Sequence, residues 1–101
     1  MINIEGAWLS EHGQLVYIIT QIHHRFVWHV VHNNGRVETG IGSFPGPEEE
    51  ETANEVEALW NFDHGTKKEA IRYANGKVIL DGSGKATNIR WSDMDHFKRL
   101  P

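Results

Sequence analysis

The chain has 101 residues, a formal net charge of −4 and no cysteine. The length favours one domain over residues 1–101, and the lack of cysteine excludes disulfides, thiolate metal sites and a cysteine nucleophile. The acidic balance argues against general nucleic-acid binding, which depends on Lys and Arg contacts with phosphates. The longest apolar run, Leu15 to Ile19, is too short to cross a membrane, and no signal-peptide pattern is present. We therefore expect a cytoplasmic protein without nucleic-acid or membrane partners; nothing indicates its oligomeric state.

Strand signals dominate the chain. Runs rich in Val, Ile, Tyr, Phe and Trp recur about every ten residues, with Gly, Asn and Asp between them. This spacing predicts an all-β fold, an antiparallel up-and-down meander closed into a small barrel of about eight strands. The expected strand segments are Ile2–Ser10, Gln14–Gln21, Phe26–His32, Arg36–Ser43, Asn54–Phe62, Lys67–Ala74, Lys77–Asp81, Thr87–Trp91 and Asp95–Leu100.

The second segment is apolar on both faces, so its orientation depends on the turn that follows it. A four-residue loop over 22–25 pairs Gln21 with Phe26 and Ile19 with Trp28. The side chains expected inside the barrel are then Leu15, Tyr17, Ile19 and Gln21.

The dipeptide Asn34-Gly35 predicts a two-residue type I′ turn, because both central positions of that turn need a positive φ. Such a turn pairs His32 with Val37 and Trp28 with Ile41. The expected inward face of this hairpin is Phe26, Trp28, Val30, His32, Val37, Thr39 and Ile41. The expected outward face of its second strand is Glu38, Gly40 and Gly42.

The stretch from Phe44 to Thr52 contains two prolines and four adjacent glutamates, which predict a solvated loop or a short helix. In the next segment an inward face alternates with polar residues; its members are Val56, Ala58, Trp60 and Phe62. A second turn, Asn75-Gly76, is expected to pair Tyr73 with Val78 and so to place Tyr73 inside. Finally, Ile89 and Trp91 share a face with Phe97 only if the loop between them holds an odd number of residues.

The two ends of the chain resemble calycin barrels, the group of lipocalins, fatty-acid-binding proteins and avidins. The first strand contains Gly6-Ala7-Trp8, similar to the Gly-x-Trp strand that opens those barrels. Arg99 stands where lipocalins have an arginine that packs across that tryptophan. The chain is shorter than lipocalins and lacks their cysteines and C-terminal helix. The resemblance implies contact between Trp8 and Arg99, a barrel fold and a general habit of holding small ligands.

Aromatic residues are numerous for a domain of this size. They either fill the barrel or line an internal cup for a small apolar or ring-bearing ligand, which a few inward polar groups would orient. The predicted ligand contacts are Tyr17, Gln21, Trp28, His32, Thr39, Trp60 and Tyr73.

Two alternatives to a binding protein remain open. One is a cofactor-free isomerase, cyclase or lyase that uses His32 or Tyr17 as acid or base in the same cup. The other is a protein-interaction module that uses the outer face. No cofactor or metal is predicted. A three-histidine site at one end of the barrel, from His12, His32 and His64 beside Asp63, is a weaker possibility.

Overall fold

The computed structural model describes residues 2–33, 35, 37–45, 54–64, 67–68, 71–92 and 94–101, and only the backbone for 61–64 and 67–68. The strands are β1 (Gly6–Ser10), β2 (Val16–Ile22), β3 (Arg25–Val31), β4 (Val37–Ser43), β5 (Glu55–His64), β6 (Lys67–Lys68), β7 (Arg72–Leu80), β8 (Ala86–Trp91) and β9 (Phe97–Arg99). The described residues include no helix that could cross a membrane.

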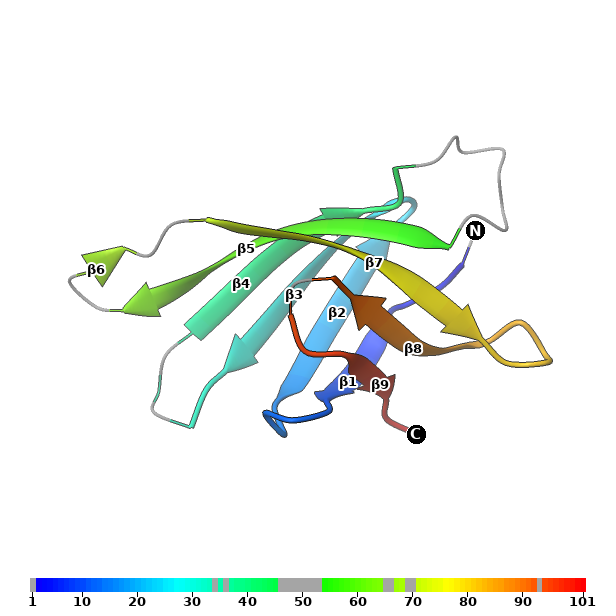
Figure 1. The fold of residues 1–101 in the computed structure, drawn as a ribbon, viewed down its shortest axis with the longest axis horizontal. Coiled ribbons are helices and arrows are strands. Elements are labelled where there is room, and N and C mark those ends of the chain that lie inside the picture. The colour runs from blue at the N-terminus through cyan, green and yellow to red at the C-terminus, as the bar shows by residue number, and fades with distance from the viewer. Residues whose placement is uncertain are drawn as a thin grey trace.

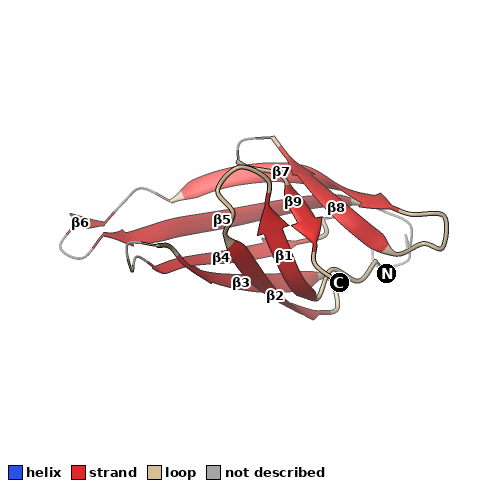
Figure 2. Cartoon of the chain, turned by 90° about the horizontal axis from the view of Figure 1, so that it is seen from below, coloured by secondary structure: helices blue, strands red, loops and turns tan. Residues whose placement is uncertain are grey.

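The predicted all-β meander barrel is confirmed. All strand pairs are antiparallel, and each strand of the ring pairs with its neighbours in the order β1, β2, β3, β4, β5, β7, β8, β9. The β9–β1 ladder closes the ring, while β6 pairs, among the described residues, with the far end of β5 alone (Figure 1). Figure 2 shows β2 to β5 side by side as one layer, with β7 to β9 forming the opposite wall.

The β2–β3 register is as predicted, but the β3–β4 register differs by one residue. Gln21 pairs with Phe26 and Ile19 with Trp28. In the next hairpin Trp28 pairs with Gly40 instead of Ile41. The strands are joined by residues 32–36 instead of by a two-residue turn, and the Gly35 amide donates to the His32 carbonyl over 2.9 Å.

This shift exchanges the two faces of β4, because successive side chains of a strand point to opposite sides. The inward positions are Glu38, Gly40 and Gly42, and the residues expected inside, Val37, Thr39 and Ile41, are exposed. The prediction that Thr39 faces the interior is therefore wrong.

The predicted turn at Asn75-Gly76 is also wrong, since β7 runs straight through both residues. Gly76 lies between Val56 of β5 and Trp91 of β8. A Cβ on Gly76 would come within 2.8 Å of the Arg90 carbonyl oxygen. Glycine is therefore needed here because the two strands lie close together, and not because of a turn. As a result Tyr73 faces outward and is 49% exposed, contrary to the expectation for it.

Two other expectations about facing are confirmed. Val56, Ala58 and Trp60 are buried, as the alternation in β5 predicts; the side chain of Phe62 lies outside the described residues, as do residues 46–53 of the acidic stretch. The segment between β8 and β9, residues 92–96, has an odd length. Accordingly Ile89, Trp91 and Phe97 share the inner face.

The barrel interior is filled with aromatic rings around Trp28. The rings of Phe26 and Trp28 are stacked, with centroids 6.3 Å apart, and both lie against β4. A Cβ on Gly40 would come within 2.1 Å of Trp28, and one on Gly42 within 2.2 Å of Phe26. The two glycines are therefore required for the rings to pack against the strand.

The predicted contact between Trp8 and Arg99 is confirmed. These residues are opposite each other in the β1–β9 ladder, and the guanidinium carbon lies 4.7 Å from the centre of the indole ring. Arg99 also donates to the carbonyls of Asn3 and Glu5, over 2.8 and 3.2 Å. Arg99 thus joins the last strand to the segment that precedes the first.

Gln21 holds the same N-terminal segment in place. Its side-chain oxygen accepts from the Ile4 amide over 2.7 Å, and its side-chain nitrogen donates to the carbonyls of Ile2 and His23. Ile2 and Ile4 are buried as part of the core. The segment therefore covers one end of the barrel, and the Gln21 amide is occupied in anchoring it.

Candidate functional site at a buried carboxylate

The side chain of Glu38 is buried inside the barrel, with 1% of its surface exposed. Its carboxylate accepts a hydrogen bond from the Trp28 indole N–H over 2.8 Å and one from the Tyr17 hydroxyl over 3.4 Å. The Nε2 atom of His32 lies 3.3 Å from the same carboxylate. Four side chains from β2, β3, β4 and the loop after β3 therefore meet at one acidic group.

Burial of this carboxylate is unfavourable on its own account. Charge transfer from water to a protein interior is costly, and an apolar side chain of similar volume is often at least as stabilising. Polar partners reduce the cost but do not remove it. A buried acid with converging polar groups is therefore a candidate functional position.

The environment keeps the Tyr17 hydroxyl protonated. Burial raises the pKa of this hydroxyl well above its usual range, and the negative charge of Glu38 and the hydrogen bond to it act in the same direction. Tyr17 is consequently a hydrogen-bond donor across the physiological pH range. Its ring lies edge-on to that of Trp28, with centroids 6.0 Å apart.

His32 lies between Glu38 and solvent. Its side chain is 21% exposed, compared with 1% for Glu38. It belongs to the loop that joins β3 and β4, so its position depends less on the strand ladder than that of Trp28 or Glu38. The imidazole is therefore the part of this cluster that solvent reaches.

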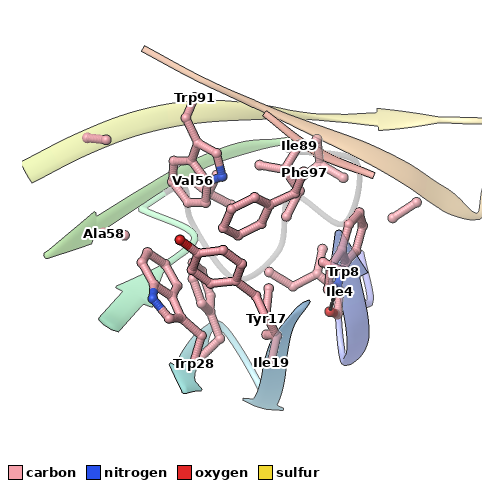
Figure 3. Packing of buried hydrophobic residues seen from close by; sticks show 14 of the residues in the cluster. Ile4, Trp8, Tyr17, Ile19, Trp28, Val56, Ala58, Ile89, Trp91 and Phe97 are labelled. Carbon is pink, nitrogen blue, oxygen red and sulfur yellow. Dashed lines mark hydrogen bonds between the residues drawn. The ribbon is translucent and has the colours of Figure 1, made fainter. Parts of the chain in front are cut away.

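The apolar side of the site is a cluster of rings. Trp28 contacts Trp60, Trp91 and Phe97, with centroid distances of 6.2, 5.7 and 6.0 Å. Figure 3 shows the Tyr17 hydroxyl within this cluster, beside the ring of Trp28. The indole N–H of Trp91 is buried and has no hydrogen-bond acceptor among the described residues. A buried N–H without an acceptor costs about 1–3 kcal/mol, so this group favours a molecule that offers one.

The structure brings together some of the predicted contact residues and separates others. Tyr17, Trp28 and His32 contact Glu38, and Trp60 packs on Trp28. Gln21 is used at the N-terminal segment, while Thr39 and Tyr73 lie on the outer face.

Sequence reasoning missed Glu38 itself. A signal was available, because Glu38, Gly40 and Gly42 alternate on one face, and glycines opposite large rings indicate close packing.

The described residues give no geometry for the weaker hypothesis of a three-histidine metal site. The side chain of His64 lies outside the described residues, as does that of Asp63. Ligand atoms of Glu11, His12 and Asp95 do lie within 4.8 Å of one another, but the first two side chains are exposed. Because His12 Nδ1 and Asp95 Oδ1 are 2.7 Å apart, the simplest role of this group is to join two loops.

The outer surface carries two larger depressions. A groove of 520 Å³ crosses β5, β7 and β8 and has a mixed lining; it includes the charged residues Glu55, Lys77 and Arg90 and the ring of Trp91. A second, of 530 Å³, lies over β2, β3 and β4 and includes Val16, Ile18 and Val31. Neither is lined by Glu38.

Comparison with known proteins identifies no relative of the chain. No protein-family model matches the chain, and neither the curated proteins nor the solved structures give a match.

Proposed function

We propose that the chain is a small-molecule-binding β-barrel protein whose ring-bearing ligand binds where Glu38, His32 and Tyr17 meet. The observation that carries this proposal is the buried carboxylate of Glu38 beside a cluster of aromatic rings. A ligand with an N–H group would donate to Glu38, and its ring would pack on Trp28 and Trp60. No cofactor is part of this proposal, and the lack of cysteine favours a cytoplasmic location.

The unpaired N–H of Trp91 refines the class of ligand. It would donate to an acceptor atom on the ring, while Glu38 accepts from a donor on the same molecule. A planar heteroaromatic molecule with both groups therefore fits better than a hydrocarbon. Because rings fill the interior, a ligand can bind only if His32 moves out and the ligand takes the place of its imidazole beside Glu38. The loop position and partial exposure of His32 favour that movement.

The test compares two probes of the same shape. Benzimidazole has one N–H donor and one ring acceptor, whereas indene has neither. We expect saturable binding of benzimidazole, followed by tryptophan fluorescence and amide chemical shifts, with indene at least about tenfold weaker. The Glu38→Gln variant should lose about tenfold or more in benzimidazole affinity, because a charge-assisted hydrogen bond becomes a neutral one.

Two controls accompany this experiment. Glu55→Gln makes the same chemical change on an exposed residue of β5 and should leave binding unchanged. The Glu38→Gln variant should be within about 1 kcal/mol of wild type in unfolding free energy, or more stable, since it removes a buried charge and keeps an acceptor for Trp28. Equal affinity of wild type and Glu38→Gln would contradict the proposal, as would shifts confined to the outer face.

A second candidate, acid–base catalysis, is favoured by the 3.3 Å contact between Glu38 and His32. A carboxylate that orients an imidazole near solvent is a common arrangement for proton transfer. Oxindole, a ring-bearing carbon acid, provides a direct assay through exchange of its C–H for deuterium in D₂O. Exchange that is faster with wild type than with His32→Gln or Glu38→Gln would support catalysis; equal rates would leave only binding.

A further inference from the structure

The outer face of β3, β4 and β5, within the layer of β2 to β5, is rich in exposed apolar side chains. One row of directly paired outward residues consists of Val27 on β3, Ile41 on β4 and Leu59 on β5. All three side chains are exposed, and Ile41, at the centre, is 62% exposed. Beyond the next row, which contains His29 and Thr39, Val31 pairs with Val37 at the ends of β3 and β4, and both are exposed as well.

A contiguous apolar surface of this kind is typical of an interface. Three strands about 4.8 Å apart and four outward positions about 6.6 Å apart define a face of about 400 Å². Two such faces would bury about 800 Å² in total, which is below the range for stable specific complexes and fits a weak, transient one. The face is therefore large enough for a weak dimer.

The charges beside the row are arranged so that the face complements itself. The next row of directly paired residues contains Arg25 on β3, Ser43 on β4 and Glu57 on β5. Arg25 and Glu57 therefore lie at the same level, one strand to either side of β4. Within the described part of the chain Arg25 makes no ion pair, and Glu57 accepts only the hydroxyls of Ser43 and Tyr73.

A twofold axis along β4, between two facing copies, exchanges the positions of β3 and β5. It places Arg25 of each copy opposite Glu57 of the other, and Val27 opposite Leu59. Ile41 then meets its own copy on the axis. A twofold axis across the strands would instead set Arg25 against His29, so the charges favour the axis along β4.

We propose that the protein forms a homodimer through this face, with its twofold axis along β4. The two layers, which Figure 2 shows as the strands β2 to β5 of one copy, would pack face to face with their strands within about 30° of each other. A depression of 320 Å³ beside Ile41, between Arg25 and Glu57, gives the face a hollow close to the axis. This inference does not depend on the proposed ligand site, which faces the barrel interior.

The first experiment measures mass against concentration by sedimentation equilibrium. Wild type is expected to form a weak dimer with a dissociation constant of about 100 μM. Ile41→Glu places two carboxylates together on the axis and should weaken the dimer at least about 100-fold. Lys98→Glu, a charge change on an exposed residue of β9, should have no effect. Circular dichroism verifies that each variant retains the fold.

The second experiment reverses the proposed ion pair. Arg25→Glu and Glu57→Arg should each weaken the dimer by about tenfold, because symmetry creates two like-charge contacts. The double variant Arg25→Glu/Glu57→Arg should restore dimerisation. Mixing the two single variants should give a heterodimer, detectable by native mass spectrometry, since both cross-contacts then become attractive.

Each outcome bears on the proposal. A wild-type protein that stays monomeric to about 1 mM, well above the expected constant, would overturn it. A dimer that Ile41→Glu leaves intact would show that another surface mediates association. Failure of both the double variant and the mixed pair to dimerise would overturn the axis along β4.

Discussion

The indole ring of Trp28 lies against β4 at Gly40, where a Cβ atom would come within 2.1 Å of the ring. Trp28 is fully buried and its N–H is bound to Glu38, so the ring has little freedom to move. We therefore expect Gly40→Ala to lower the unfolding free energy by at least about 3 kcal/mol. Gly82→Ala is the matched control, because nothing lies within 4 Å of a Cβ there. Similar denaturation midpoints for the two variants would contradict the close packing.

Substitution of Gly35 and Gly76 by Val tests two different requirements for glycine. Gly35 has a φ of 84° and open space around it, so a valine is destabilising through backbone strain, by more than about 1 kcal/mol. Gly76 has no positive φ, and valine there is destabilising because its Cβ meets the Arg90 carbonyl and the Trp91 ring. Chemical denaturation measures both. Gly35→Asn should recover part of the loss, whereas Gly76→Asn should not.

Removal of the Trp8 ring should strongly destabilise the barrel. Trp8 is fully buried, donates to the Ile4 carbonyl over 2.8 Å and packs under Arg99. We expect Trp8→Ala to lower the unfolding free energy by about 3–5 kcal/mol. Arg99→Met keeps much of the apolar stem but removes the donors to Asn3 and Glu5, and should cost about 1–3 kcal/mol. A smaller loss for Trp8→Ala than for Arg99→Met would argue against this packing.

The pair formed by His12 and Asp95 should make stability depend on pH. The hydrogen bond to Asp95, together with its charge, raises the pKa of His12. Partial burial acts to raise the pKa of Asp95, but hydrogen bonds from His12 and Gly13 outweigh it and lower the pKa. The stabilisation from His12 is full below its unfolded pKa and is lost as pH rises through the raised folded pKa. The stabilisation from Asp95 is lost as pH falls through the lowered pKa of this carboxyl group.

The His12–Asp95 pair therefore stabilises the fold most at pH values between the lowered pKa of Asp95 and the raised pKa of His12. We expect wild type to exceed His12→Gln in unfolding free energy near about pH 5 and to lose that advantage by about pH 9. Denaturation of both proteins across this range measures the difference. A difference that does not change with pH would show that His12 acts without its charge.

The fold could be predicted from the sequence because the period of alternation and the spacing of strands do not depend on any single turn. The strand registers that were predicted from a single dipeptide were wrong. The connection at Asn34-Gly35 is longer than the predicted turn by an odd number of residues, so the predicted inward and outward faces of β4 were exchanged. Thr39 was therefore predicted to lie inside, and Glu38 was predicted to lie outside. At Asn75-Gly76 tertiary pairing on both sides of β7 overrode the local turn preference.

The site could be predicted only in part for the same reason. Tyr17, Trp28 and Trp60 lie on strands whose facing was correct, and each of them contacts the proposed site. Glu38 lies on the strand whose facing was inverted. No local pattern indicates that a glutamate will be buried, because its burial follows from partners that are distant in sequence, such as Tyr17.

The ladder between β1 and β9 also has a consequence for how the chain folds during synthesis. Trp8 and Arg99 are paired, and the Leu100 amide donates to the Ala7 carbonyl over 2.9 Å. Because β1 is synthesised before β9, it has one edge without its partner until β9 has been made. The meander from β1 to β8 can assemble hairpin by hairpin as the chain emerges, since neighbours in sequence are mostly neighbours in space. Closure of the ring therefore comes after the other hairpins, and the nascent protein is most exposed to edge-to-edge aggregation just before it.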